Sequence, residues 1–241
     1  VSVIETLVRL GSTAIDTPND DGCTPMFMAV QKGHDSSMET LVRLGSKAVD
    51  TPDNDGLTPM LMAAKNGHIS VIETLIQLGS TAIDTPSKYK ETPMYVAAKN
   101  GRASVIRTLV RLGSTTIDTP NKYGCTPMIV AAMRGHVSVI ETLVRLGSAA
   151  IDTPNIRGIT PICIAAALGH VSMVETLVRL GSTAIDICTD YEWTPMYVAA
   201  LNGRVPIIET LIRLGSASID TPDTTGRTPM IMAAMYGHDL V

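Results

Sequence analysis

The sequence repeats itself every 34 residues, and this period limits the fold more than any other feature. The dipeptide Thr-Pro occurs seven times in this register. A repeat this short cannot bury both faces of its own secondary structure, but neighbouring repeats can cover one another. The chain is therefore expected to form a row of similar repeats stabilised by contacts between neighbours. The dipeptides begin at Thr24, Thr58, Thr92, Thr126, Thr160, Thr194 and Thr228.

Each Thr-Pro dipeptide predicts the start of a first helix. A threonine hydroxyl accepts hydrogen bonds from free backbone N–H groups at that point, and proline at the first helical position loses no hydrogen bond. The small residues that follow, as at residues 60–64, let neighbouring helices approach closely. The next glycine, Gly67 in this repeat, predicts the end of the helix because glycine tolerates the left-handed conformation found there.

A second helix is expected after this glycine, most clearly at residues 137–147. Ser138 and Glu141 have the spacing of a capping box, the apolar residues form one helical face, and Glu141 is placed to pair with Arg145 one turn later. The link to the next Thr-Pro has turn signals around a short β-branched element, which predicts a hairpin-like loop. The expected fold class is all-α, a solenoid of stacked helix-turn-helix units with protruding hairpin-like loops.

The repeat resembles the ankyrin repeat. Residues 55–84 contain Gly-Leu-Thr-Pro-Met, then Ala-Ala and Gly-His, which is similar to the Gly-x-Thr-Pro-Leu-His-x-Ala-Ala and Gly-His signature of that family. The resemblance covers the whole chain. It implies a single ankyrin-repeat array over residues 1–241, with about seven helix pairs and with both ends truncated within a repeat.

Two departures from the ankyrin pattern affect the loops. The period is 34 residues rather than roughly 33, and the extra residue falls in the Gly-Ser-x-Ala-Ile-Asp segment, which predicts a slightly larger loop. The family's histidine after Thr-Pro-Leu is missing in every repeat, so any polar tie that it makes must be supplied by other residues. Its position is taken by Phe27, Leu61, Tyr95, Ile129, Cys163, Tyr197 and Ile231.

Composition and charge disfavour several classes of function. The net charge of −4 gives no overall attraction to nucleic acid or to anionic membranes. No apolar run approaches the roughly 18 residues that a membrane span needs. The four cysteines have no CxxC spacing, so we interpret them as reduced thiols of an intracellular protein, with the cytoplasm as the expected compartment.

Two sets of repeated polar residues suggest a metal site or catalysis, but their spacing disfavours both. Equivalent atoms of stacked repeats lie roughly 8–10 Å apart, whereas zinc needs ligands at about 2 Å. We interpret the histidines as groups near helix C-termini and the aspartates as turn formers. No catalytic triad or phosphate-binding loop stands out, so we expect no enzyme activity, no cofactor and no metal. The two sets are His34, His68, His136, His170 and His238, and Asp16, Asp50, Asp84, Asp118, Asp152, Asp186 and Asp220.

The repeats differ at few positions, and these positions carry every aromatic residue of the chain. They lie beside the loop glycine, before Thr-Pro, after the following Met, and before the helix-ending glycine. The ankyrin resemblance implies that they line the loop tips and the concave side of the first helices, the usual partner-binding face. Tyr and Trp suit such contacts because they offer large amphipathic area at little entropic cost. The predicted partner-binding residues are Tyr89, Tyr95, Tyr123, Met133, Arg134, Arg157, Ile159, Tyr191, Trp193, Tyr197 and Tyr236.

The aromatic residues that follow the Met have a second interpretation. Phe27, Tyr95 and Tyr197 are equally well explained as side chains partly buried against the next loop. The loop before Thr194 departs most from the pattern, since Glu192 replaces the turn glycine. A side chain in a left-handed turn costs roughly 1–2 kcal/mol, unless that loop adopts another shape.

The charges at the variable positions indicate the kind of partner. Lysines and arginines gather in the middle of the array, with acidic residues on either side. This favours a protein or peptide partner that is acidic and partly apolar, bound by a monomeric chain, and it disfavours nucleic acid. A structural spacer or regulatory arm of a longer protein, without a tight partner, is the alternative. A third hypothesis is an engineered consensus array, and the unequal loops of the repeats disfavour it.

Overall fold

The computed structural model describes residues 2–187 and 189–238. The chain divides into two compact units, Val1–Ile117 and Asp118–Val241, called here the N-terminal unit and the C-terminal unit. The described residues contain α-helices and short 3₁₀ helices and no strand, which confirms the all-α expectation.

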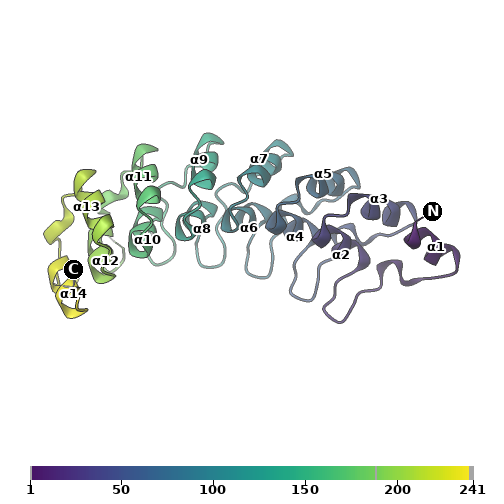
Figure 1. The fold of residues 1–241 in the computed structure, drawn as a ribbon, viewed down its shortest axis with the longest axis horizontal. Helices are drawn as coiled ribbons and strands as arrows, with labels where there is room; N and C mark the ends of the chain where they lie inside the picture. Colours follow the sequence, from purple (N-terminus) through teal and green to yellow (C-terminus); the bar gives the residue numbers. More distant parts are fainter. Residues whose placement is uncertain (1, 188, 239–241) are drawn as a thin grey trace. The chain divides into compact units, whose positions relative to one another are not determined.

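The helices of the N-terminal unit alternate between second helices and first helices. In Figure 1 its first helices form one row, its second helices form another, and the loops extend from the first helices on the side away from the second helices. The helices are α1 (Val3–Arg9), α2 (Pro25–Lys32), α3 (Asp35–Arg43), α4 (Pro59–Asn66), α5 (Ile69–Gln77), α6 (Pro93–Lys99) and α7 (Ala103–Arg111).

In the C-terminal unit first helices alternate with second helices, and the described residues begin and end with a first helix (Figure 1). Neighbouring first helices pack against each other and against the second helix of their own repeat. The helices are α8 (Pro127–Arg134), α9 (Val137–Arg145), α10 (Pro161–Leu168), α11 (Val171–Arg179), α12 (Pro195–Leu201), α13 (Val205–Arg213) and α14 (Pro229–Met235).

The first helices begin and end where the local signals predict. Thr126 Oγ1 accepts a hydrogen bond from the backbone N–H of Ile129 at 3.2 Å, and Pro127 occupies the first helical position. Gly135 ends the helix in the left-handed conformation, with a φ of 72°. The residue after this proline, Met128, is fully buried. The expected first helix is confirmed, and apolar aliphatic side chains rather than aromatic rings fill most of its core.

The second helices confirm the expected element. The expected capping box is present in α1, where Ser2 and Glu5 bond to each other's backbone N–H groups, but it is absent from α9. In α9 the helix begins at Val137 and its N-cap is His136, whose carbonyl accepts from the backbone N–H groups of Val139 and Ile140. Ser138 therefore lies inside the helix, and the predicted capping box is wrong there. The chain turns into the second helix directly after the helix-ending glycine, so the helix starts before the serine is reached.

The predicted pairing of Glu141 with Arg145 is also wrong. Arg179 on the next second helix donates to Glu141 at 2.7 Å, across 38 residues of sequence. This ion pair and its equivalents between other second helices are solvent-exposed, so each stabilises the fold by only about 0–1 kcal/mol. They link the same points of successive second helices. The equivalent pairs are Glu5–Arg43, Glu73–Arg111 and Glu175–Arg213.

The loops contain a polar link between repeats that the sequence did not reveal. The expected short β-branched element is a one-turn 3₁₀ helix in several repeats, such as Ala48–Asp50. The Asp50 carboxylate accepts from Ser80 Oγ at 2.5 Å and from the backbone N–H of Thr81 at 2.9 Å, in the next loop. The aspartates thus connect successive loops rather than only forming turns. The other pairs are Asp16–Ser46, Asp84–Ser114, Asp118–Ser148, Asp152–Ser182 and Asp186–Ser216.

Two of these aspartates have a lowered pKa. Burial by itself raises the pKa of Asp84, but hydrogen bonds from Ser114, Thr115 and Thr116 favour the carboxylate and bring the pKa below its ordinary value. The pKa of Asp186 is lowered against the same desolvation by hydrogen bonds from the loop that follows. These links are therefore made by charged carboxylates at neutral pH.

Three of the repeated histidines, His68, His170 and His238, contact the C-terminus of the first helix in the preceding repeat. His170 Nε2 lies 3.2 Å from the carbonyl oxygen of Met133, in the last turn of α8. Arg204, at the same position one repeat later, donates to the carbonyl of Ala167 at 3.4 Å. Histidine and arginine at this position thus contact the same backbone feature of their neighbour.

Candidate partner-binding surface

Each loop tip of the C-terminal unit is a tight turn organised by its first side chain. In residues 121–125, Asn121 Oδ1 accepts from the backbone N–H groups of Tyr123 and Cys125 at 2.9 and 3.1 Å. The backbone N–H of Asn121 in turn donates to the carbonyl of Cys125 at 2.9 Å. The turn directs its second and third residues outward, so Lys122 and Tyr123 are exposed. The Lys122 ammonium lies 4.8 Å from the centroid of the Tyr123 ring.

The same turn recurs with different organising residues. Asn155 Oδ1 accepts from the backbone N–H groups of Arg157 and Ile159 at 2.9 and 3.1 Å. In residues 189–193 the hydroxyl of Thr189 accepts the two equivalent bonds, both at 3.3 Å. The outward positions therefore vary in chemistry while the backbone shape is kept.

The turn at residues 189–193 keeps this shape without glycine. Glu192 has a φ of 58°, in the left-handed region, so the alternative of a differently shaped loop is wrong. Lys90, at the same position in the N-terminal unit, also has a φ of 58°. Both residues bear the strain that a Cβ brings to this conformation.

The aromatic cluster near this turn runs from the surface into the interior. The ring of Tyr191, which is 57% exposed, lies 5.4 Å from that of half-buried Trp193, measured between ring centroids. Trp193 stacks on Tyr197 at 5.6 Å, with 16° between the ring planes. Tyr197 is 0% exposed. Only the outer part of this cluster is open to a partner.

A buried polar group that the sequence did not predict lies beneath the cluster. The Tyr197 hydroxyl donates to Asp223 Oδ2 at 2.8 Å, and Arg227 donates to the same oxygen through Nε at 3.0 Å. Burial and the neighbouring carboxylate raise the pKa of Tyr197 to about 12. Burial opposes ionisation of Asp223, but hydrogen bonds from Thr225, Arg227 and Tyr197 bring its pKa well below the ordinary value. The sequence offers little indication of this group. Asp53 takes the position of Asp223 in another repeat, but no equivalent of Thr225 or Arg227 follows it there.

The other predicted contact residues of the C-terminal unit are spread over its loops and first helices. Met133 is half-buried and Arg134 exposed at the end of α8, and Ile159 is half-buried before the cap of α10. Tyr236 is exposed after α14. In the N-terminal unit, Tyr89 is an exposed loop-tip residue.

Two predicted contact residues lie in the interior. Tyr95 and Tyr197 are buried, as is Phe27 at the equivalent position. The packing interpretation describes them, and their rings offer no surface to a partner. The reason is that this position on a first helix faces inward, where the neighbouring repeat covers it.

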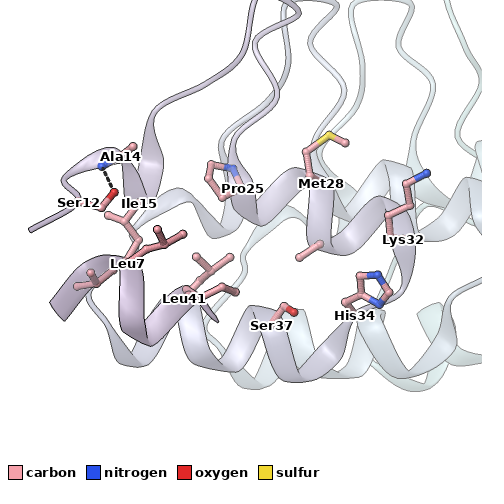
Figure 2. Close-up of a pocket in the computed structure, with 13 residues that line it drawn as sticks. Leu7, Ser12, Ala14, Ile15, Pro25, Met28, Lys32, His34, Ser37 and Leu41 are labelled. Carbon is pink, nitrogen blue, oxygen red and sulfur yellow. Dashed lines mark hydrogen bonds between the residues drawn. The ribbon is translucent and has the colours of Figure 1, made fainter. Parts of the chain in front are cut away.

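An apolar cavity lies at the other end of the chain, in the N-terminal unit. It has a volume of about 460 Å³ and is lined mainly by α1 and α2, including Leu7 and Met28, and by Ile15 in the 3₁₀ turn between them. In Figure 2 the side chains of Leu7, Ile15 and Leu41 lie close together, and those of Pro25 and Met28 extend from α2. Within the N-terminal unit, α4 packs against α2 and α6 packs against α4. Most of its lining is apolar, although Lys32 and His34 also line the cavity.

The described residues show neither a metal site nor a membrane span. No group of three or more His, Cys, Asp or Glu side chains in residues 2–187 and 189–238 is placed to hold a metal ion. No helix in the same residues is long and apolar enough to cross a bilayer. Cys23, Cys125 and Cys163 are free thiols, and Cys188 lies outside the described residues.

Comparisons with known proteins agree with this architecture. A family model described as "Ankyrin repeats (3 copies)" matches residues 1–85, 79–155, 146–223 and 162–241. Among solved structures, the chain is similar to the ankyrin repeat domain of Bcl-3, a member of the IkappaB protein family. The identity is 24%, the TM-score is 0.75, and the match covers 89% of this chain and 95% of that chain. At this identity the structural match shows the fold alone. A comparison with curated proteins found no match.

Proposed function

Because the chain belongs to the ankyrin-repeat family, we propose that it is a non-enzymatic binding module whose loop tips and concave first-helix face hold a protein or peptide partner. Ankyrin repeats are generally protein–protein interaction modules. The observation that carries the proposal is the exposure of tyrosines on the loop tips, with Tyr123 54% and Tyr191 57% exposed. These two tyrosine side chains are not needed to form the turns, because other side chains accept the hydrogen bonds that hold the turns together.

The burial of two predicted contact tyrosines reduces the set of residues that can form this surface. With Tyr197 in the interior, the contact area of the C-terminal unit consists of Tyr123, Arg157, Tyr191 and the exposed edge of Trp193. Exposed tyrosines contribute to interfaces by burying large rings while their hydroxyls stay hydrogen-bonded. The proposal includes an intracellular setting, which is common among ankyrin-repeat proteins, and a monomeric chain.

The test is affinity capture from a cell lysate with a double variant, Tyr123→Ala with Tyr191→Ala. Both side chains are exposed, so the melting temperature should stay close to that of the wild type. Captured proteins that are present with the wild type should be lost. Ile212→Ala is the matched control, since this exposed apolar residue lies on α13, away from the loop tips.

Two outcomes would contradict the proposal. The first is capture of the same proteins by the double variant at unchanged levels, as expected for a spacer or regulatory arm. The second is equal loss in the Ile212→Ala control, which would show general stickiness rather than a defined surface.

A further inference from the structure

The loop tips of the C-terminal unit differ in charge in a regular order. The first two tips carry Lys122 and Arg157, and the third carries Asp190 and Glu192. All four side chains are exposed. Among these three tips, positive charge therefore lies on the first two and negative charge on the third. The fourth tip also carries a cation, Arg227, but its guanidinium is paired with the Asp223 carboxylate.

The order of the tips in space is set by contacts between neighbouring turns. The backbone N–H of Ile156 donates to the carbonyl of Tyr123 at 3.4 Å, which joins the first tip to the second. A Cβ on Gly158 would lie 2.6 Å from the backbone nitrogen of Asp190, so the second tip touches the third. The three turns thus form one continuous strip, defined here as the tip strip: residues 122–123, 156–157 and 190–192.

The tip strip also has exposed apolar area between its charges. Ile156 is 68% exposed and lies on the middle tip, in register with Lys122 on the first tip and Asp190 on the third. Apolar and aromatic contacts supply most of the affinity of an interface, whereas charges at its edges select and orient the partner. A partner that matches this strip needs an apolar centre and opposite charges at its two ends.

We propose that the tip strip binds an extended peptide segment with acidic residues at one end, an apolar middle, and basic residues at the other end. This rests on the proposed function and names the partner's chemistry. The acidic end would face Lys122 and Arg157, and the basic end would face Asp190, Glu192 and the ring of Tyr191, which also attracts cations. A uniformly acidic partner would meet two exposed carboxylates on the third tip, which disfavours it.

The spacing of the tips sets the length of the segment. Neighbouring repeats are separated by roughly 8–10 Å, so the first and third tips lie about 16–20 Å apart. An extended chain advances about 3.3 Å per residue, and about five or six residues therefore separate the acidic end from the basic end.

The test measures the binding of labelled synthetic peptides to the full chain by fluorescence anisotropy. The first peptide has paired glutamates and paired lysines about six residues apart, with tyrosine and leucine between them. A second has the same composition with the charges alternating, and two more carry only the acidic or only the basic charges. The wild type should bind the first peptide at least about tenfold more tightly than the second.

Charge reversal on one end of the strip should change this preference. Lys122→Glu with Arg157→Glu makes all three tips acidic, and this variant should prefer the basic peptide. Asp190→Lys with Glu192→Lys makes them basic, and this variant should prefer the acidic peptide. Lysine is compatible with the left-handed position of Glu192, because Lys90 already occupies that conformation.

Equal binding of the segregated and alternating peptides by the wild type would overturn the inference, as would a reversal variant with an unchanged preference. If a reversal variant unfolds by circular dichroism, the neutral variants Lys122→Gln with Arg157→Gln and Asp190→Asn with Glu192→Gln should lose the preference without reversing it. Lysate capture separates the two proposals. Loss with the tyrosine variant but not with the reversal variants would leave the binding module standing and refute the charge order.

Discussion

The turns at residues 155–159 and 189–193 share one backbone shape but are held by different residues. In the first, Asn155 accepts bonds of 2.9 and 3.1 Å and Gly158 takes the left-handed position with a φ of 71°. In the second, Thr189 accepts longer bonds of 3.3 Å and Glu192 takes the strained position. The interactions within the second turn therefore stabilise it less than those within the first turn.

Contacts with side chains outside the second turn compensate for its weaker internal interactions. Trp193 stacks on Tyr197, and Tyr197 is bonded to Asp223, which belongs to the next loop. In the first turn the residue equivalent to Tyr197 is the much smaller Cys163. The comparison shows that a loop in a repeat protein can lose its local signals when a buried anchor in the neighbouring helix replaces them.

The largest expected effect is the loss of this anchor. Tyr197→Ala should lower the free energy of unfolding by about 3–5 kcal/mol, because it removes a buried ring and leaves Asp223 with one partner fewer. Cys163→Ala, the matched change below the first turn, should cost about 1 kcal/mol. Urea denaturation followed by circular dichroism measures both. Equal losses in the two variants would show that the second turn has no special anchor.

A smaller effect isolates the hydroxyl of the anchor. Tyr197→Phe should cost about 1.5–3 kcal/mol at neutral pH, the value typical of a hydrogen bond to a charged group. The folded-state pKa of Tyr197 is raised from 10.0 to about 12, so the stabilisation is complete below pH 10.0 and is lost as the pH rises through about 12. The difference in urea midpoint between wild type and Tyr197→Phe should therefore shrink over that range. A constant difference would contradict the assignment of the bond.

The smallest effect concerns the left-handed position itself. Glu192→Gly should stabilise the protein by about 1 kcal/mol because it relieves the strain. Gly158→Ala, in the first turn, should destabilise it by about 1–2 kcal/mol, since the new Cβ adds the strain and meets the backbone of Asp190. Thermal melting of the two variants gives both signs. A loss of stability in Glu192→Gly would show that the glutamate side chain makes a contact that outweighs its strain.

Much of the helical architecture could be predicted from the sequence, whereas the candidate surface could be predicted only in part. Tyr123 and Tyr191 were predicted as contact residues and are exposed. Tyr95 and Tyr197 occupy variable positions too, but they are buried. Variation between repeats shows that the repeat fold does not require one particular residue at a position. It does not show whether the side chain there faces solvent or the next repeat.

The sequence by itself determined the period, the starts of the first helices and their glycine ends, because each depends on hydrogen bonds within about four residues of chain. Only the tertiary structure decided that Glu141 pairs with Arg179, that the repeated aspartates accept hydrogen bonds from the next loop, and that the Tyr197 hydroxyl donates to Asp223. Each of these partners belongs to the neighbouring repeat. The period identifies equivalent residues, but the packing of one repeat on the next determines which non-equivalent residues meet.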